Sequence, residues 1–269
     1  MSEEKKERLV SKSQMRQFET CPAQWKFQHI DRAPTSDVDS GPLIFGTQVH
    51  QGIADYYEEI DPNHLKFLHK ESIRESLTRH LINVKGDQDR IQSIIDNMVT
   101  FEWNRYNKYG PECFKPVLVE KTYEVSPFKG IVDVVFLAKA GTKNVIVTDW
   151  KTGRYNPSEW DNDGLTIYSF FLIKDGYTVV EASTVFVEHG MKTLNVIDME
   201  KVMKKANNFF HKTGNPNYFF PKKKSWTCRW CPYTVICYYE DDEEFSVEVI
   251  SESEMALRIL EKMKVNGYA

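Results

Sequence analysis

Two aspartates and one lysine are the residues whose spacing most directly suggests chemistry. Asp133 lies within the apolar run 130–138, Asp149 lies within the apolar run 144–151, and Lys151 follows two residues later. An ionised carboxylate in such a strand is costly unless a cation compensates it. Because residues i and i+2 of a strand point to the same face, Asp149 and Lys151 are predicted to project side by side. Asp133 on the neighbouring strand could reach that same face.

Two carboxylates placed in this way repel each other and stay ionised together only if a cation lies between them. Oxygen ligands with open positions suit Mg²⁺ or Mn²⁺, which lower the pKa of a bound water and stabilise a charged phosphate transition state. Lys151 would orient or help deprotonate the water and offset phosphate charge. The alternative is a salt-bridged Asp–Lys pair at a strand end, which this short motif leaves open. Gly130 and Gly153 bracket the strands and are interpreted as room for backbone or substrate.

Clustered cysteines suggest a second centre. Cys228, Cys231 and Cys237 follow a C-x₂-C-x₅-C spacing, and either Cys21 or Cys113 could complete a tetrathiolate site. The cytosol keeps thiols reduced, so metal ligation is favoured over disulfides. Zinc and an iron–sulfur cluster both accept four thiolates, and the spacing alone does not separate them.

The order of the predicted elements fits an α+β fold, with a mixed sheet flanked by helices. Hydrophobic periodicity and turn residues predict these elements. They are a helix over 11–30, a loop over 33–42, helices over 45–60 and from about 64 to 109, strands over 116–125, 130–138 and 144–151 in an antiparallel meander, a helix over 164–175, a strand over 178–188, a helix over 198–212, and a helix in the tail.

Length and charge limit the functional classes. The chain has 269 residues and a net charge of −4, which excludes a global basic surface for nucleic acid. The lysine run 222–224 is either a solvated linker or a local nucleic-acid contact. Its aromatic neighbours Tyr218, Phe219, Phe220 and Trp226 could stack on bases or pack. The first residues resemble no signal peptide and no apolar stretch could span a bilayer, so we expect a soluble, cytoplasmic protein with no membrane partner.

The order of motifs resembles the RecB-type branch of the PD-(D/E)XK nucleases. The matching pieces are "FGTQVH", "GIVD", "DWK" and "GLTIY". The resemblance implies a restriction-endonuclease-like core and the following roles. His50, Asp133, Asp149 and the backbone carbonyl of Trp150 would hold the metal, Lys151 would be catalytic, and Tyr168 would position DNA or the active site. Glu120 is a lesser candidate for an outer-shell role, with a plain surface acid as its alternative. The chain departs from the pattern at Gly164, where the branch has a glutamine.

The cysteines resemble those of the iron–sulfur members of this branch, the AddB-like proteins and the RecB-like exonucleases of CRISPR adaptation. These carry one cysteine before the nuclease core, in the context S-x₄-F-x₂-C-P, and three after it, as C-x₂-C-P-Y-x₃-C. Both patterns occur here, from Ser13 to Pro22 and from Cys228 to Cys237. The resemblance implies a [4Fe–4S] cluster on Cys21, Cys228, Cys231 and Cys237, and leaves Cys113 as a free, buried thiol.

These motifs divide the chain into four segments of one compact unit. The expected segments are an N-terminal helical region (1–110), the nuclease core (111–215), a cluster-binding segment (216–240) and a tail (241–269). The implied function is a metal-dependent DNA exonuclease acting on single-stranded or frayed ends. A nuclease fold used only to bind DNA or a partner, and a zinc-stapled structural protein, are the alternatives. No Walker A loop occurs, so any ATP-driven step would come from a recombination, helicase or CRISPR-adaptation partner.

Overall fold

The computed structural model describes residues 8–35 and 41–239. The predicted tail helix therefore lies outside the described residues. The chain forms two compact units, one made of residues 1–12 and 41–206 and the other of residues 13–40 and 207–269. Among the described residues, none of the helices combines the length and the apolar character that a membrane crossing requires.

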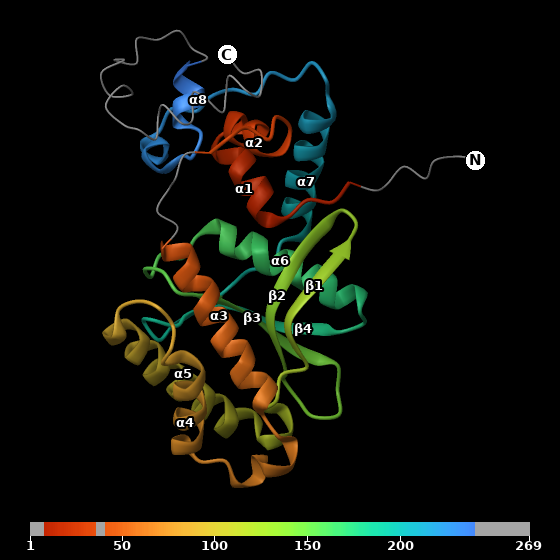
Figure 1. Ribbon diagram of the computed structural model, residues 1–269. Helices are drawn as coiled ribbons and strands as arrows, with labels where there is room; N and C mark the ends of the chain where they lie inside the picture. The colour runs from red at the N-terminus through yellow and green to blue at the C-terminus, as the bar shows by residue number, and fades with distance from the viewer. Residues whose placement is uncertain (1–7, 36–40, 240–269) are drawn as a thin grey trace, which may run out of the picture. The chain divides into compact units, whose positions relative to one another are not determined.

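A mixed five-stranded sheet in the order β1-β2-β3-β4-β5 forms the centre of the first unit (Figure 1). Its strands are β1 (Leu118–Val125), β2 (Phe128–Leu137), β3 (Asn144–Lys151), β4 (Thr178–Phe186) and β5 (Met191–Leu194). The first three pair antiparallel, which confirms the predicted meander. β4 runs parallel to β3, and the short β5 pairs antiparallel with β4. The sequence analysis missed β5, which is only four residues long and mostly exposed.

Helix α6 (Glu159–Lys174) connects the parallel strands β3 and β4. Its beginning is fixed by a capping box, in which the Asp161 carboxylate accepts hydrogen bonds from the backbone N–H (2.8 Å) and hydroxyl (2.9 Å) of Ser158. The predicted beginning at Gly164 was wrong, because this capping pair lies ahead of the apolar run. The earlier beginning adds five residues, about one and a half turns, to the N-terminal end of the helix.

Five further helical elements of the first unit form a layer on the other face of the sheet, in one core with Trp150 and Phe136. They are α3 (Gly41–Glu59), the 3₁₀ helix η1 (Pro62–Phe67), α4 (Lys70–Leu81), α5 (Gln88–Tyr109) and the 3₁₀ turn η2 (Pro111–Cys113). The predicted loop over 33–42 was wrong at its end, since Gly41 and Pro42 form the first turn of α3. Trp150 packs edge-on against Phe101 of α5 at 5.4 Å and parallel to Tyr57 of α3 at 6.5 Å. Because neighbouring strand residues alternate, this packing turns Asp149 and Lys151 away from α3 and α5.

A buried ion pair lies in the same core. Glu102 of α5 is fully buried, and Arg105 is 5% exposed. One Glu102 oxygen accepts a hydrogen bond from the Tyr57 hydroxyl at 2.7 Å, and the other accepts one from Arg105 at 2.6 Å. Arg105 also donates to the Cys113 carbonyl at 2.9 Å, so its charge is fully engaged.

The second unit contains residues from both ends of the chain. Its elements include α1 (Lys12–Thr20, of which Lys12 belongs to the first unit), α2 (Pro22–His29), the 3₁₀ helix η3 (Trp226–Trp230) and α8 (Thr234–Tyr239), while α7 (Met199–Gly214) contributes its residues from 207 on. The prediction of one helix over 11–30 was wrong. Cys21 is extended (φ −153°) and caps α2, and Pro22 lacks the N–H that would continue α1.

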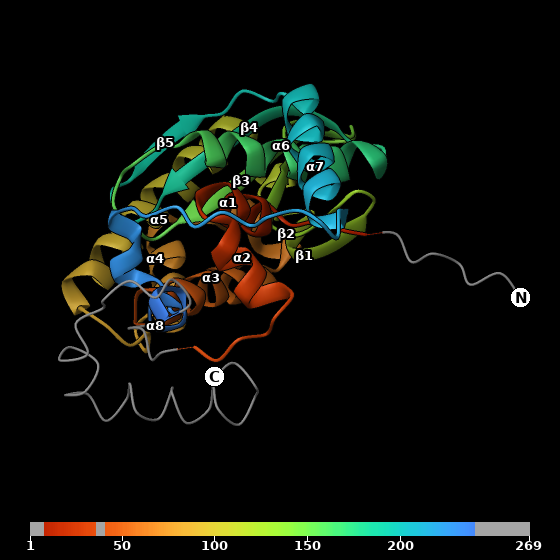
Figure 2. The same ribbon diagram turned by 90° about the horizontal axis from the view of Figure 1, so that it is seen from above.

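Residues from the two chain ends share a small core within this unit. The rings of Phe27 in α2 and Tyr233 lie 5.8 Å apart, and Ala23, Ala33 and Ile236 complete the cluster. Figure 2 shows α8 beside α2. Cys21, Cys231 and Cys237 pack against the same cluster.

We expect Glu102→Ala to destabilise the protein by about 3–5 kcal/mol, because it leaves the buried charge of Arg105 without its partner. Chemical denaturation followed by circular dichroism would measure the loss. Glu58→Ala, at an exposed position of α3, is the matched control and should change little. A Glu102→Ala protein as stable as the wild type would show that the pair is not needed.

Candidate active site

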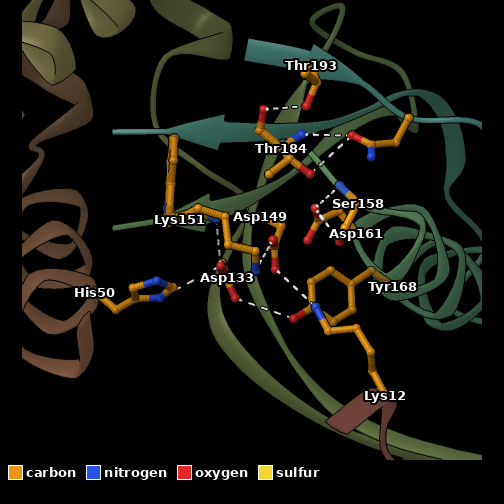
Figure 3. A network of polar contacts seen from close by, with 12 residues as sticks. Lys12, His50, Asp133, Asp149, Lys151, Ser158, Asp161, Tyr168, Thr184 and Thr193 are labelled. Carbon is orange, nitrogen blue, oxygen red and sulfur yellow. Dashed lines mark hydrogen bonds and ion pairs between the residues drawn. The ribbon is translucent and has the colours of Figure 1, made fainter. Parts of the chain in front are cut away.

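Three carboxylates lie next to one another on adjacent strands. The register of the β1–β2 pair places Glu120 opposite Asp133. The register of the β2–β3 pair places Asp149 opposite Asp133 as well, just beyond the last paired residues, Val134 and Thr148. The sequence analysis predicted that Asp133 and Asp149 would converge, and the structure brings them together at the open end of this ladder (Figure 3).

The backbone pairing of β2 with β3 has ended at this point, and the Asp133 carboxylate accepts a hydrogen bond that a backbone carbonyl would otherwise accept. Its Oδ2 accepts a hydrogen bond from the Trp150 N–H at 2.8 Å, and the Tyr168 hydroxyl lies 3.5 Å from its Oδ1. Burial and the nearby charge of Asp149 raise the pKa of Asp133 to about 7, although the charge of His50 acts in the opposite direction. Asp133 therefore carries its full negative charge near neutral pH only when more positive charge is nearby.

Nearby cations compensate the negative charge of Asp149 better than that of Asp133. Lys151 forms an ion pair with its Oδ2, and the Lys12 ammonium lies 3.9 Å from its Oδ1. Burial alone would raise the pKa of Asp149, but the charges of Lys12 and Lys151 outweigh it and lower that pKa. For Lys151, the charge of Asp149 outweighs burial and raises the pKa. Lys151 is therefore held as an ammonium ion.

His50 projects from α3 toward the acids. Its Nδ1 lies 3.4 Å from Glu120 Oε1 and 3.7 Å from Asp133 Oδ2. Ligand atoms of these three residues all fall within 4.8 Å of one another, the arrangement of a metal site. Burial lowers the pKa of His50, but the hydrogen bond to Glu120 and the charge of Asp133 raise it more strongly. Figure 3 shows the imidazole directed at Asp133.

Glu120 is the site residue that the sequence analysis underrated. Its backbone has a φ of +43°, a left-handed conformation that a non-glycine residue in a strand rarely adopts. Such a conformation costs on the order of 1–3 kcal/mol and is typically found at functional sites. The sequence analysis named Glu120 only as a lesser outer-shell candidate, and the register of β1 against β2 is what places it beside Asp133.

The lack of a side chain at residue 164 has a physical explanation that the sequence analysis did not find. A Cβ at Gly164 would lie 2.7 Å from both Cδ and Nζ of Lys12, so the side chain of Lys12 occupies this space. No backbone atom lies close to Gly130 or Gly153, so their interpretation as room for an approaching substrate stays a prediction. A Cβ at Gly130 would make an ordinary 3.5 Å contact with Phe171, and one at Gly153 would meet nothing within 4 Å.

The four cysteines of the predicted cluster line one cavity of the second unit, together with the lysine run 222–224. Burial and the neighbouring thiols of Cys21 and Cys228 raise the pKa of Cys231. Cys113 is buried in the first unit as predicted, and burial raises the pKa of its thiol.

The lysine run is not simply a solvated linker. Lys222 donates a hydrogen bond to the Cys237 carbonyl at 2.8 Å, and Lys223 donates one to the Glu19 carbonyl at 2.5 Å. Among the aromatic neighbours, Tyr218 and Phe220 pack against Phe18. Phe219 is 80% exposed, and the side chain of Trp226 lies outside the described part of the structure.

The family model described as PD-(D/E)XK nuclease superfamily matches residues 9–238, and the chain belongs to this superfamily. Membership implies a nuclease, and the grouped histidine and acids provide a metal-type site. A solved structure titled "Crystal structure of SSO0001" aligns over 88% of this chain and 88% of that chain, at 14% identity and a TM-score of 0.37. No curated protein matches the chain.

Without metal, Asp133→Asn should make the protein more stable above pH 7 and have little effect near pH 4. The folded pKa of Asp133, about 7, lies above the unfolded value of about 3.9, so stability present at low pH is lost as the pH rises between these values. Asparagine cannot ionise and can still accept the hydrogen bond from the Trp150 N–H. Thermal unfolding in a chelator at pH 4 and pH 8 measures the effect.

Adding Mn²⁺ to the same samples gives the complementary result. The ion should raise the melting temperature of the wild type at pH 8 and raise that of Asp133→Asn much less, because a bound ligand stabilises the folded state. Glu58→Gln serves as the control. Equal melting temperatures for wild type and Asp133→Asn at pH 8 would contradict the charge repulsion described here.

Proposed function

We propose that the chain is a metal-dependent DNA nuclease, and more specifically an exonuclease that acts on single-stranded or frayed DNA ends. The observation that carries the proposal is the convergence of Glu120, Asp133 and Asp149 from adjacent strands, with the Lys151 ammonium beside them. This arrangement provides a place for a divalent cation next to a group that can contact a phosphodiester.

The donor set fits Mg²⁺ or Mn²⁺, because it combines several carboxylate oxygens with one imidazole. His50, Asp133, Asp149 and the carbonyl of Trp150 would hold the ion, and Glu120 joins them through its position beside His50 and Asp133. The raised pKa of Asp133 supports this assignment, since it reflects negative charge that a cation would compensate. When bound, the ion would supply positive charge for the transition state and lower the pKa of a water ligand.

Lys151 acts as a hydrogen-bond donor in this proposal. Asp149 holds its pKa above the usual value, so it is protonated at neutral pH. Its ammonium can therefore orient the attacking water and offset charge on the phosphate oxygens, and it is poorly suited to act as a base. Tyr168, whose hydroxyl faces Asp133, would help to orient that carboxylate.

We further propose that Cys21, Cys228, Cys231 and Cys237 hold a [4Fe–4S] cluster, as in the iron–sulfur RecB-like branch. These cysteines, all of them described, line one cavity of the second unit. Four thiolates can bind either one zinc ion or an iron–sulfur cluster. The resemblance of their spacing to that of the iron–sulfur branch supports the cluster.

The proposed setting follows from these centres. An iron–sulfur cluster and free thiols suit the cytoplasm, and a nuclease without an ATP-binding loop suits a recombination, repair, helicase or CRISPR-adaptation partner. A nuclease fold that only binds DNA is the competing proposal, and the presence or absence of cleavage separates the two.

Lys151→Ala should reduce cleavage of end-labelled single-stranded DNA in Mn²⁺ by at least about 100-fold, because the ammonium acts on the charge that develops in the transition state. Binding of the same DNA, measured by fluorescence anisotropy in a chelator, should change only several-fold. Lys139→Ala, at an exposed turn between β2 and β3, is the control and should cleave normally. Wild-type cleavage by Lys151→Ala would remove this lysine from the mechanism, and a wild type that binds DNA without cutting it would favour the binding module.

Protein purified without oxygen should be brown and contain about four iron atoms per chain if the cluster is present. Cys231→Ser should lose iron and unfold at a lower temperature, since ligation contributes to folding. Cys113→Ala should keep its iron, because Cys113 lies in the other unit. A colourless wild type with one zinc per chain would refute the cluster assignment.

A further inference from the structure

Lys12 is a second cation at the acid site that no motif predicts. Its side chain passes over Gly164, where a Cβ would be 2.7 Å from its Nζ, and its ammonium lies 3.9 Å from Asp149 Oδ1. Figure 3 shows it reaching the acids from the side of Tyr168, while Lys151 reaches them from the opposite side. The site is thus bordered by two ammonium groups from separate parts of the chain.

Lys12 compensates the charge of Asp149 without forming a hydrogen bond to it. Asp149 already forms a closer ion pair with Lys151, and 3.9 Å is too long for a hydrogen bond. The Lys12 side chain is 24% exposed, whereas that of Asp149 is only 4% exposed. The Lys12 side chain is therefore partly open to solvent, and its ammonium, which makes no hydrogen bond to Asp149, can still bind an anion.

We propose that Lys12 binds a backbone phosphate of the nucleic-acid substrate at the acid site, in a space that exists because residue 164 has no side chain. This inference rests on the proposed function, because it assumes that a phosphodiester reaches the acids. An ammonium group is a suitable partner for phosphate and supplies charge without reading sequence. It also offsets the repulsion that a polyanion meets from three neighbouring carboxylates.

The absence of a side chain at Gly164 and the position of Lys12 are coupled sterically. A Cβ at residue 164 would collide with the end of the Lys12 side chain, which is flexible and can move aside. Gly164→Ala should therefore displace the ammonium without disturbing the backbone, and alanine is a better helix former than glycine in α6. The two positions are thus linked through space, and that link is measurable.

The test is the salt dependence of DNA binding without metal. A fluorescent oligothymidine is titrated with the protein in a chelator, from 50 to 200 mM NaCl, for wild type, Lys12→Gln and the control Lys139→Gln. Lys12→Gln should bind several-fold more weakly, and the slope of log K against log salt should be shallower by about 0.7, the value of one lost phosphate contact on a single strand. Lys139→Gln should leave both affinity and slope unchanged.

A double-mutant cycle tests the link to Gly164. Gly164→Ala should weaken binding and flatten the slope in the wild type, and should have no further effect in the Lys12→Gln background. An equal effect in both backgrounds would overturn the link, and an unchanged affinity and slope in Lys12→Gln would overturn the phosphate contact. A wild type that does not bind the oligonucleotide would overturn it as well. Circular dichroism confirms that each variant is folded.

Cleavage by the wild type in Mn²⁺ is measured in parallel, so that the two proposals can fail separately. If the wild type cleaves and Lys12→Gln keeps the full affinity and slope, the role of Lys12 is refuted and the proposed nuclease activity is supported. A wild type that never cleaves, but loses one phosphate contact with Lys12→Gln, refutes the nuclease and supports the contact.

Discussion

Negative charge concentrated at one end of a buried strand ladder is the constraint on which the rest of the site depends. Glu120, Asp133 and Asp149 come from three adjacent strands, and two of them are buried. Their repulsion is offset unequally. Lys12 and Lys151 both act on Asp149 and lower its pKa, whereas Asp133 has a backbone N–H, a tyrosine hydroxyl and His50, and its pKa is raised. Two acids of one type thus differ in charge state through their surroundings alone. The acid that lacks a full positive partner is the one beside His50 and Glu120, where a divalent ion fits.

The scaffold holds this arrangement from the opposite face of the sheet. Trp150 fills the core between α3 and α5, and its backbone N–H donates to Asp133. One residue therefore orients both aspartates, because its packing also fixes the direction of Asp149. The left-handed backbone at Glu120 shows that the fold accepts local strain here. Proteins commonly give up stability in this way at sites where repelling groups must be held together.

The parts of the site that the sequence predicted are those governed by local geometry. The two-residue period of strands places Lys151 beside Asp149, and two strands joined by a short turn are neighbours, so Asp133 is within reach. The helix break at Cys21 and the beginning of α6 could also have been predicted from local rules. Pro22 and the capping pair Ser158–Asp161 are standard signals that the periodicity masked. Lys12 and the pair Glu102–Arg105 could not be found in this way, and Glu120 was found only as a lesser candidate, since the partners of all four residues depend on register and packing.

Gly164 shows why a departure from a family pattern is a weak argument for lost function. Judged by residue type, the position has lost a polar side chain that the resemblance implied. The structure shows that the same space is occupied by the ammonium of Lys12, which comes from a segment far away in the sequence. A site requires a polar group at a place and can receive it from any element that reaches that place. Lys12 can hold this position only because residue 164 has no side chain, so the two residues have to be considered together.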